Sequence, residues 1–120
     1  MGLDQYAEVF SKAGLAVLVY DNRCLGASDG EPRSDIDPRW QLRDYRSAIS
    51  FAQAQKECDP DRIGVWGTSY TGGTVCAVAA LDRRVKAVVS QVPFINGLRN
   101  LQQFIPVTKM AEFHRMLDED

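Results

Sequence analysis

Three short apolar runs, separated by long stretches with helical periodicity, place the strongest constraint on the fold of this chain. The runs are "LAVLVY" at residues 15–20, "RIGVW" at 62–66 and "VKAVVSQV" at 85–92. Each is rich in β-branched and apolar residues, which is typical of a strand buried on both faces. The gaps between them are too long for hairpins, so we expect parallel strands joined by helical crossovers. The sequence therefore predicts an α/β fold with three parallel strands.

Helices are predicted in the gaps from their periodicity and their end signals. Tyr6, Ala7 and Phe10 share one face of a helix over residues 4–13. Asp37 followed by Pro38 is typical of a helix start, and this second helix extends toward residue 55. A third helix is predicted over 70–81, and two short amphipathic helices follow, at 98–104 and from 108 onward. We expect residues 3–93 to form the core βα units and residues 94–120 to begin a cap or helical excursion.

Composition limits the partners of the chain. Its 14 basic and 16 acidic residues are interspersed, which leaves no basic surface for nucleic acid or an anionic membrane. The apolar runs are far shorter than the ~20 residues of a membrane-spanning helix. Three cysteines without paired spacing and one histidine, His114, suggest neither a disulfide framework nor a metal site. We expect a cytoplasmic protein, with a peroxisomal signal on a longer parent chain left open.

A sheet of three parallel strands is narrow for an open α/β domain. Either the 120 residues are the middle part of a larger domain, or the exposed sheet edges support self-association. We favour the first interpretation.

The turn "GTSYTGG" at residues 67–73 nearly matches G-x-S-x-G, in which a nucleophilic serine lies on a strained strand-to-helix turn. Gly67, Gly72 and Gly73 would let the helix pass close to the strand. Thr71 departs from the pattern, because the common sequence has glycine there. A phosphate-binding loop is the main alternative, and Gly73 stands where that loop needs lysine. The other alternative is a tight strand-to-helix turn that has no catalytic role. We predict that Ser69 is a catalytic nucleophile.

The loop "VYDNRCLGASDGEPR", residues 19–33, follows the first apolar run. Because the carboxyl ends of parallel strands meet at one edge of a sheet, this loop and the Ser69 turn should be neighbours. We expect Arg23 to form an ion pair with Asp21 or with Asp44. Gly26 and Gly30 are predicted to take backbone angles that other residues avoid.

Three segments together resemble the α/β-hydrolase superfamily: "YDNRCLGASDG", "DPDRIGVWGTSYTGG" and "ALDRRVKAVVSQVPF". They are similar to the loop after its fourth strand, its fifth strand with the nucleophile elbow, and its sixth strand. More narrowly, the chain resembles fungal and bacterial hydrolases with a G-x-S-Y-[ST]-G-G elbow, among them thiohydrolases and polyketide acyltransferases of secondary-metabolite and toxin biosynthesis. In that subgroup a hydroxyl residue at the position of Thr71 is familiar. The resemblance implies the central part of an α/β-hydrolase fold, a partial domain over residues 1–120.

The resemblance also implies a function. Ser69 would be the nucleophile, and the backbone N–H of Tyr70 would be an oxyanion donor. The implied activity is a serine-dependent acyl hydrolase or acyltransferase for a small-molecule ester or thioester, for example a polyketide intermediate, with no cofactor and no metal. In the family the acid and histidine of the triad come later in the chain, so His114 is not expected to be the base. The alternative is a catalytically inactive remnant that binds an acyl ligand or a partner. Apolar residues after the third run are candidates either for a pocket wall or for ordinary packing: Phe94, Ile95, Leu98, Phe104 and Ile105.

Overall fold

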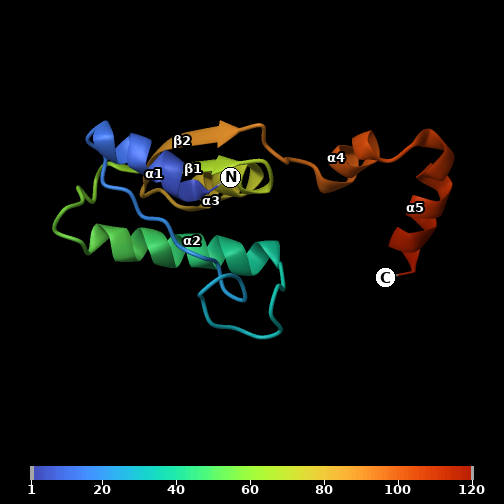
Figure 1. Ribbon diagram of the computed structural model, residues 1–120, viewed down its shortest axis with the longest axis horizontal. Helices are drawn as coiled ribbons and strands as arrows, with labels where there is room; N and C mark the ends of the chain where they lie inside the picture. Colours follow the sequence, from blue (N-terminus) through green and yellow to red (C-terminus); the bar gives the residue numbers. More distant parts are fainter. Residues whose placement is uncertain (1, 120) are drawn as a thin grey trace.

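The structure is a computed structural model that describes residues 2–119 and contains helices on either side of a small parallel sheet (Figure 1). All five helices predicted from periodicity are present, with ends shifted by a few residues. In chain order the elements are α1 (Leu3–Lys12), α2 (Pro38–Gln53), β1 (Ile63–Thr68), α3 (Tyr70–Leu81), β2 (Val85–Gln91), α4 (Gly97–Phe104), the short 3-10 helix η1 (Val107–Lys109) and α5 (Met110–Asp118).

The sheet consists of β1 and β2, which run parallel and are joined by α3. Ile63 lies opposite Val85 at one end of the pair, and Thr68 lies opposite Gln91 at the other. This arrangement confirms the parallel pairing that the long gaps in the sequence predicted. Because Ser69 directly follows β1, it lies at the same edge of the sheet as the residues that follow β2.

The predicted strand at residues 15–20 is wrong, and the sheet has two strands rather than three. The segment is extended but pairs with no strand among residues 2–119. It leaves α1 and passes along α2 (Figure 1), with Leu15, Val17, Leu18 and Val19 between 40% and 59% exposed. An apolar, β-branched composition favours an extended backbone, but a strand forms only where a neighbouring strand supplies hydrogen-bond partners.

The core lies between β1, α2 and α3. Val75 and Val78 of α3 are fully buried, and they pack with Val65 of β1 and Ile49 of α2. On the other face of β1, Trp66 contacts the rings of two α1 residues, Tyr6 at a centroid distance of 4.8 Å and Phe10 at 5.9 Å. Since successive strand residues point to opposite faces, β1 is covered on both sides. β2 is less covered than its apolar run predicts, because Val88 is 40% and Val89 is 56% exposed.

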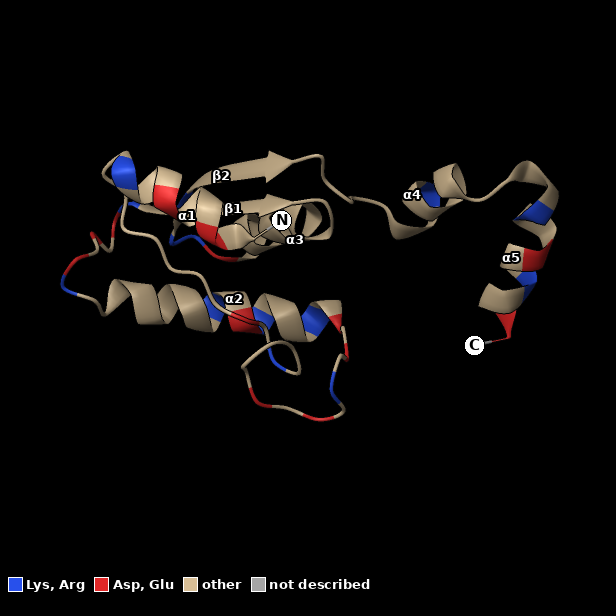
Figure 2. Ribbon diagram, in the orientation of Figure 1, with Lys and Arg blue, Asp and Glu red and all other residues tan. Residues whose placement is uncertain are grey.

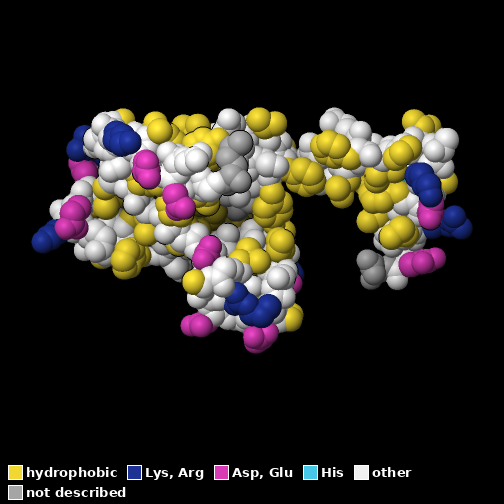
Figure 3. All heavy atoms as spheres, in the orientation of Figure 1, with side chains coloured by type: hydrophobic (Ala, Val, Ile, Leu, Met, Phe, Trp, Pro, Cys, Tyr) yellow, Lys and Arg dark blue, Asp and Glu magenta, His cyan; other side chains and the backbone are white. Residues whose placement is uncertain are grey.

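The C-terminal helices α4 and α5 extend away from this core as an arm (Figure 1). Hydrophobic side chains remain on the surface of the arm (Figure 3), with Phe104 79% and Val107 89% exposed. The radius of gyration is 16.8 Å, whereas a compact chain of this length has about 14 Å. The division into core units and a cap, which the sequence predicts at residue 93, stays a prediction.

Charged residues of both signs occur on α1, on α2 and in the loops (Figure 2). Within residues 2–119, no helix combines the length and the apolar character that a membrane crossing requires.

Candidate active site

Ser69 occupies a sharp turn between β1 and α3. Thr68 is the last residue of β1 and Tyr70 is the first of α3, so a single residue reverses the chain direction. Its backbone angles are φ 54° and ψ −120°, a region that residues with a side chain rarely adopt. Such a conformation costs about 1–3 kcal/mol and persists only where the surroundings enforce it. The predicted strand-to-helix turn is therefore present, and its strain falls on the serine.

The segment after β2 holds this turn in place. The backbone N–H of Ser69 donates to the carbonyl of Gln91 at 2.9 Å, and the N–H of Phe94 donates to the carbonyl of Ser69 at 2.8 Å. Both peptide groups of the strained residue are thus used by a neighbouring chain segment. Val92, between these two contacts, also has a positive φ of 46°. Tight turns after β1 and after β2 support each other at the carboxyl edge of the sheet.

The three glycines of the turn make room for the backbone, as the sequence predicts. A Cβ at Gly67 would lie 2.5 Å from the carbonyl oxygen of Thr71, where the new helix passes back over the strand. A Cβ at Gly72 would lie 3.0 Å from the carbonyl oxygen of Gln91, and one at Gly73 would overlap that of Phe94. The backbone of Thr71, and not its side chain, therefore makes the close approach, which explains why threonine is accommodated there.

Tyr70 directly follows Ser69, the nucleophile candidate. Its side chain contacts the segment after β2. Its ring packs on Phe94 with centroids 6.4 Å apart, and its hydroxyl oxygen is buried without a hydrogen-bond partner among residues 2–119. Burial raises the pKa of Tyr70, and the carboxylate of Asp37 raises it further. Asp37 caps α2 by accepting from the N–H of Arg39 at 2.7 Å. The sequence indicated that Asp37 caps α2 but gave no signal that its carboxylate influences Tyr70.

The loop after residue 20 is fastened to α2. Asp44 accepts from the Arg23 backbone N–H at 3.0 Å, from Nε at 2.9 Å and from Nη2 at 2.6 Å. Of the two expected partners, Asp44 is therefore the one that Arg23 contacts. Asp21 instead accepts from the N–H of Ala27 at 2.9 Å. The loop thus packs on α2, whose N-cap is Asp37.

The glycines of this loop adopt the predicted special angles, with φ 52° at Gly26 and φ 125° at Gly30. A Cβ at Gly26 would overlap the carboxylate of Asp21. These two glycines therefore fix the loop conformation close to the point where Arg23 meets α2.

His114 lies on α5 in the arm, not near Ser69. Its exposed ring contacts the side-chain nitrogen of Gln102 at 3.2 Å and lies next to the ring of Phe113. Within the described part of the chain, the Ser69 side chain makes no capping hydrogen bond to the start of α3. The apolar residues that follow β2 do not enclose a pocket in this structure, since Ile95, Leu98 and Phe104 are 48% to 79% exposed.

Comparison with known proteins gives several matches. The family model described as X-Pro dipeptidyl-peptidase (S15 family) matches residues 3–103. The quorum-quenching protein AidA of Acinetobacter baumannii is 43% identical over 110 residues, which cover 92% of this chain and 36% of AidA. The thiohydrolase aneE of Aspergillus aculeatus is 44% identical over 91 residues, which cover 76% of this chain and 29% of aneE.

The crystal structure of the α/β-hydrolase GrgF from Penicillium sp. sh18 superposes on this structure with a TM-score of 0.77 at 34% identity. The match covers 98% of this chain and 42% of GrgF. The chain thus spans about a third of the length of the curated relatives it matches.

Proposed function

Because this chain belongs to the X-Pro dipeptidyl-peptidase (S15) family and matches an α/β-hydrolase structure, we propose that it carries the nucleophile of a serine-dependent acyl hydrolase or acyltransferase. Its relatives include AidA, thiohydrolases and polyketide transferases, so the resemblance drawn from the three sequence motifs is confirmed. The proposed nucleophile is Ser69.

The observation that carries this proposal is the strained backbone of an exposed serine between a strand and a helix. A structural turn could use glycine at φ 54° without strain, so a serine there calls for another explanation. The helix start also leaves its first N–H groups without partners inside the helix. The N–H of Tyr70 is one of them, which supports its proposed role as oxyanion donor.

The proposed reaction is acyl transfer in two steps. The Ser69 oxygen attacks the carbonyl carbon of the acyl substrate while its proton passes to a general base. The leaving group then departs with a proton, and an acyl-serine remains. Water or an alcohol or amine acceptor next attacks the acyl-serine and releases the product. A serine nucleophile without its base loses about 10⁴- to 10⁶-fold in turnover. We propose that the base belongs to the part of the relatives' length that this chain does not span.

The proposed substrate is an ester or thioester, with a polyketide acyl group as one candidate. The support comes from the relatives, since one is named a thiohydrolase and others are named polyketide transferases. Hydrolysis and transfer differ only in the acceptor. Product analysis with and without an added alcohol or amine therefore distinguishes them.

The test uses a fluorophosphonate probe on the full-length gene product that contains this sequence. We expect one label per chain in the wild-type protein and none after Ser69→Ala. Ser11→Ala is the matched control, because Ser11 is an exposed serine on α1. Labelling that survives Ser69→Ala in a protein with an unchanged circular dichroism spectrum would exclude Ser69 as the nucleophile.

A second candidate function is binding without catalysis. The observations in its favour are that His114, the one histidine of the sequence, lies on α5 in the arm, and that Val88 and Val89 of β2 are exposed. In that case the gene product would be folded and silent to the probe, and it would self-associate through the sheet edge. Sedimentation velocity over a range of concentrations measures that association.

A further inference from the structure

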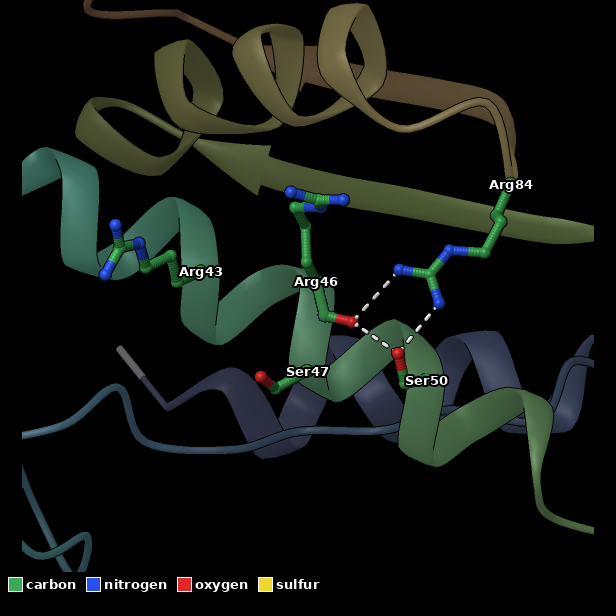
Figure 4. Close-up of a pocket in the computed structure, with 5 residues that line it drawn as sticks. All are labelled: Arg43, Arg46, Ser47, Ser50 and Arg84. Carbon is green, nitrogen blue, oxygen red and sulfur yellow. Dashed lines mark hydrogen bonds between the residues drawn. The ribbon is translucent and has the colours of Figure 1, made fainter.

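A hollow of about 270 Å³ lies at the edge of the sheet opposite to Ser69. It is lined by Arg43, Arg46, Ser47 and Ser50 of α2, together with Arg84, which directly precedes β2 (Figure 4). Because β1 and β2 are parallel, the start of β2 and the end of β1 lie at opposite edges of the sheet. The hollow is therefore separate from the proposed catalytic turn.

The α2 residues of the hollow form one stripe. They occupy positions i, i+3, i+4 and i+7 of the helix, a spacing that places them on a single face. Arg84 approaches this stripe from the turn between α3 and β2, and its guanidinium lies across from Arg46 in Figure 4. Three arginines and two serines thus line one open hollow on the surface.

Some donors of this lining already make hydrogen bonds within the protein. Asp82, only 5% exposed, accepts from Arg84 Nε at 2.8 Å and from Arg84 Nη2 at 2.6 Å. It also accepts from Arg46 Nε at 3.4 Å. Arg84 Nη1 donates to the Ser50 hydroxyl at 2.8 Å. Arg84 and Ser50 are therefore fixed as one wall of the hollow.

The other donors have no partner among residues 2–119. Arg46 uses only Nε, so both of its terminal nitrogens are free. Arg43 makes no hydrogen bond, and its guanidinium carbon lies 4.5 Å from the centre of the Trp40 ring, a cation–π contact that uses none of its N–H donors in a hydrogen bond. The hydroxyl of Ser47 is also free. Like charges three residues apart on a helix repel each other, and a bound anion would offset that repulsion.

We propose that this hollow binds a phosphate-sized oxyanion, either inorganic phosphate or the phosphate group of a phosphomonoester. Arg46 and Arg43 donate from their free N–H groups, and Ser47 donates its hydroxyl. Guanidinium groups form short, charge-assisted hydrogen bonds to phosphate. Among residues 2–119, Asp82 is the carboxylate that contacts the lining, and it accepts from Arg46 and Arg84. The volume is several times the ~30 Å³ share of one water molecule, so an oxyanion has room.

The test is calorimetric titration of the full-length gene product with inorganic phosphate and, separately, with glycerol 3-phosphate, against chloride at equal ionic strength. We expect phosphate-specific binding that weakens about tenfold or more in Arg46→Gln and in Arg43→Gln. Arg83→Gln is the control, because it removes the same charge from an exposed neighbour that does not line the hollow. Tighter binding of glycerol 3-phosphate identifies a phosphomonoester as the ligand, and tighter binding of phosphate identifies the free ion.

Heat no greater than that of chloride, or equal affinities in Arg46→Gln, Arg43→Gln and Arg83→Gln, would overturn the proposal. The proposal does not depend on the catalytic function. Fluorophosphonate labelling of Ser69 should be unchanged in Arg46→Gln, so the failure of one proposal is distinguishable from the failure of the other.

Discussion

At the scale of single residues, the turn at Ser69 depends on close backbone approaches, which are possible because glycines have no side chain. The pattern "GTSYTGG" was sufficient to predict a sharp turn with the serine at its apex, because glycines and a hydroxyl residue between a strand and a helix have few other uses. The pattern could not show what the glycines make room for. Gly72 and Gly73 are approached by residues 91–94, a segment about 20 positions further along the chain, and sequence-local reasoning has no access to that contact.

This contact makes Gly73→Ala a specific test of the packing. The added Cβ would overlap the Phe94 carbonyl, which is part of the backbone and cannot rotate away. We expect the free energy of unfolding to fall by about 1–3 kcal/mol, as in other overpacked sites. Gly64→Ala is the matched control, because its Cβ would meet its nearest atoms at 3.7 Å, an ordinary contact. Urea unfolding of both variants gives the comparison, and equal stabilities would show that the post-β2 segment is not packed against α3.

At the scale of elements, the sequence predicted helices better than strands. A helix satisfies its hydrogen bonds within itself, so periodicity and caps such as Asp37 locate it. A strand needs a neighbouring strand for its hydrogen bonds, and the composition of a segment does not show whether such a neighbour is present. Residues 15–20 have the strongest strand composition of the chain, yet they remain unpaired in the structure. The hollow lined by residues 43–50 and Arg84 was not predicted, because Arg84 lies more than 30 positions further along the chain and meets α2 only in the folded structure.

The junction of α2, α3 and β2 depends on one buried carboxylate. Hydrogen bonds from Arg84 hold the pKa of Asp82 well below its usual range, and a hydrogen bond from Arg46 adds to this effect. Burial alone would raise this pKa. Because the pKa is lower in the folded state, the carboxylate contributes its full stability above the unfolded pKa of about 4. That contribution is lost progressively as the pH falls below about 4.

Asp82→Asn tests this junction. The amide replaces an acceptor oxygen by a donor that faces Arg84, so we expect a loss of about 1–3 kcal/mol in the free energy of unfolding at pH 7. The wild-type protein should lose more stability than the variant as the pH falls from about 4 to about 2. Glu8→Gln is the control, since Glu8 pairs with Lys12 at 3.9 Å on an exposed surface and should change stability by under about 1 kcal/mol. Parallel pH profiles for wild type and Asp82→Asn would contradict the assignment.

At the scale of the whole molecule, the order of three modest motifs predicted the family, although each motif alone was weak. The motifs carried no information on how residues 94–120 sit relative to the core. Phe94, Ile95 and Leu98 suit a pocket wall or a packed interface by composition, but in this structure Ile95 and Leu98 are largely exposed. An amphipathic pattern shows that a helix has an apolar face. It does not show which other element packs against that face, because this depends on the folded arrangement of the whole chain.

The separation of arm and core predicts a stability difference that hydrogen exchange can measure. Local stability follows buried apolar contacts. The helix α3 has Val75 and Val78 fully buried, whereas no residue of α4 or α5 within the described range is buried. Isolated helices of eight or nine residues are marginal in water. In the 120-residue chain we therefore expect amides of residues 97–118 to exchange at least ~100-fold faster than those of α3. The helix α1, held by two ring contacts to Trp66, should be intermediate. Equal protection in α3 and α5 would mean that the arm folds back onto the core in solution.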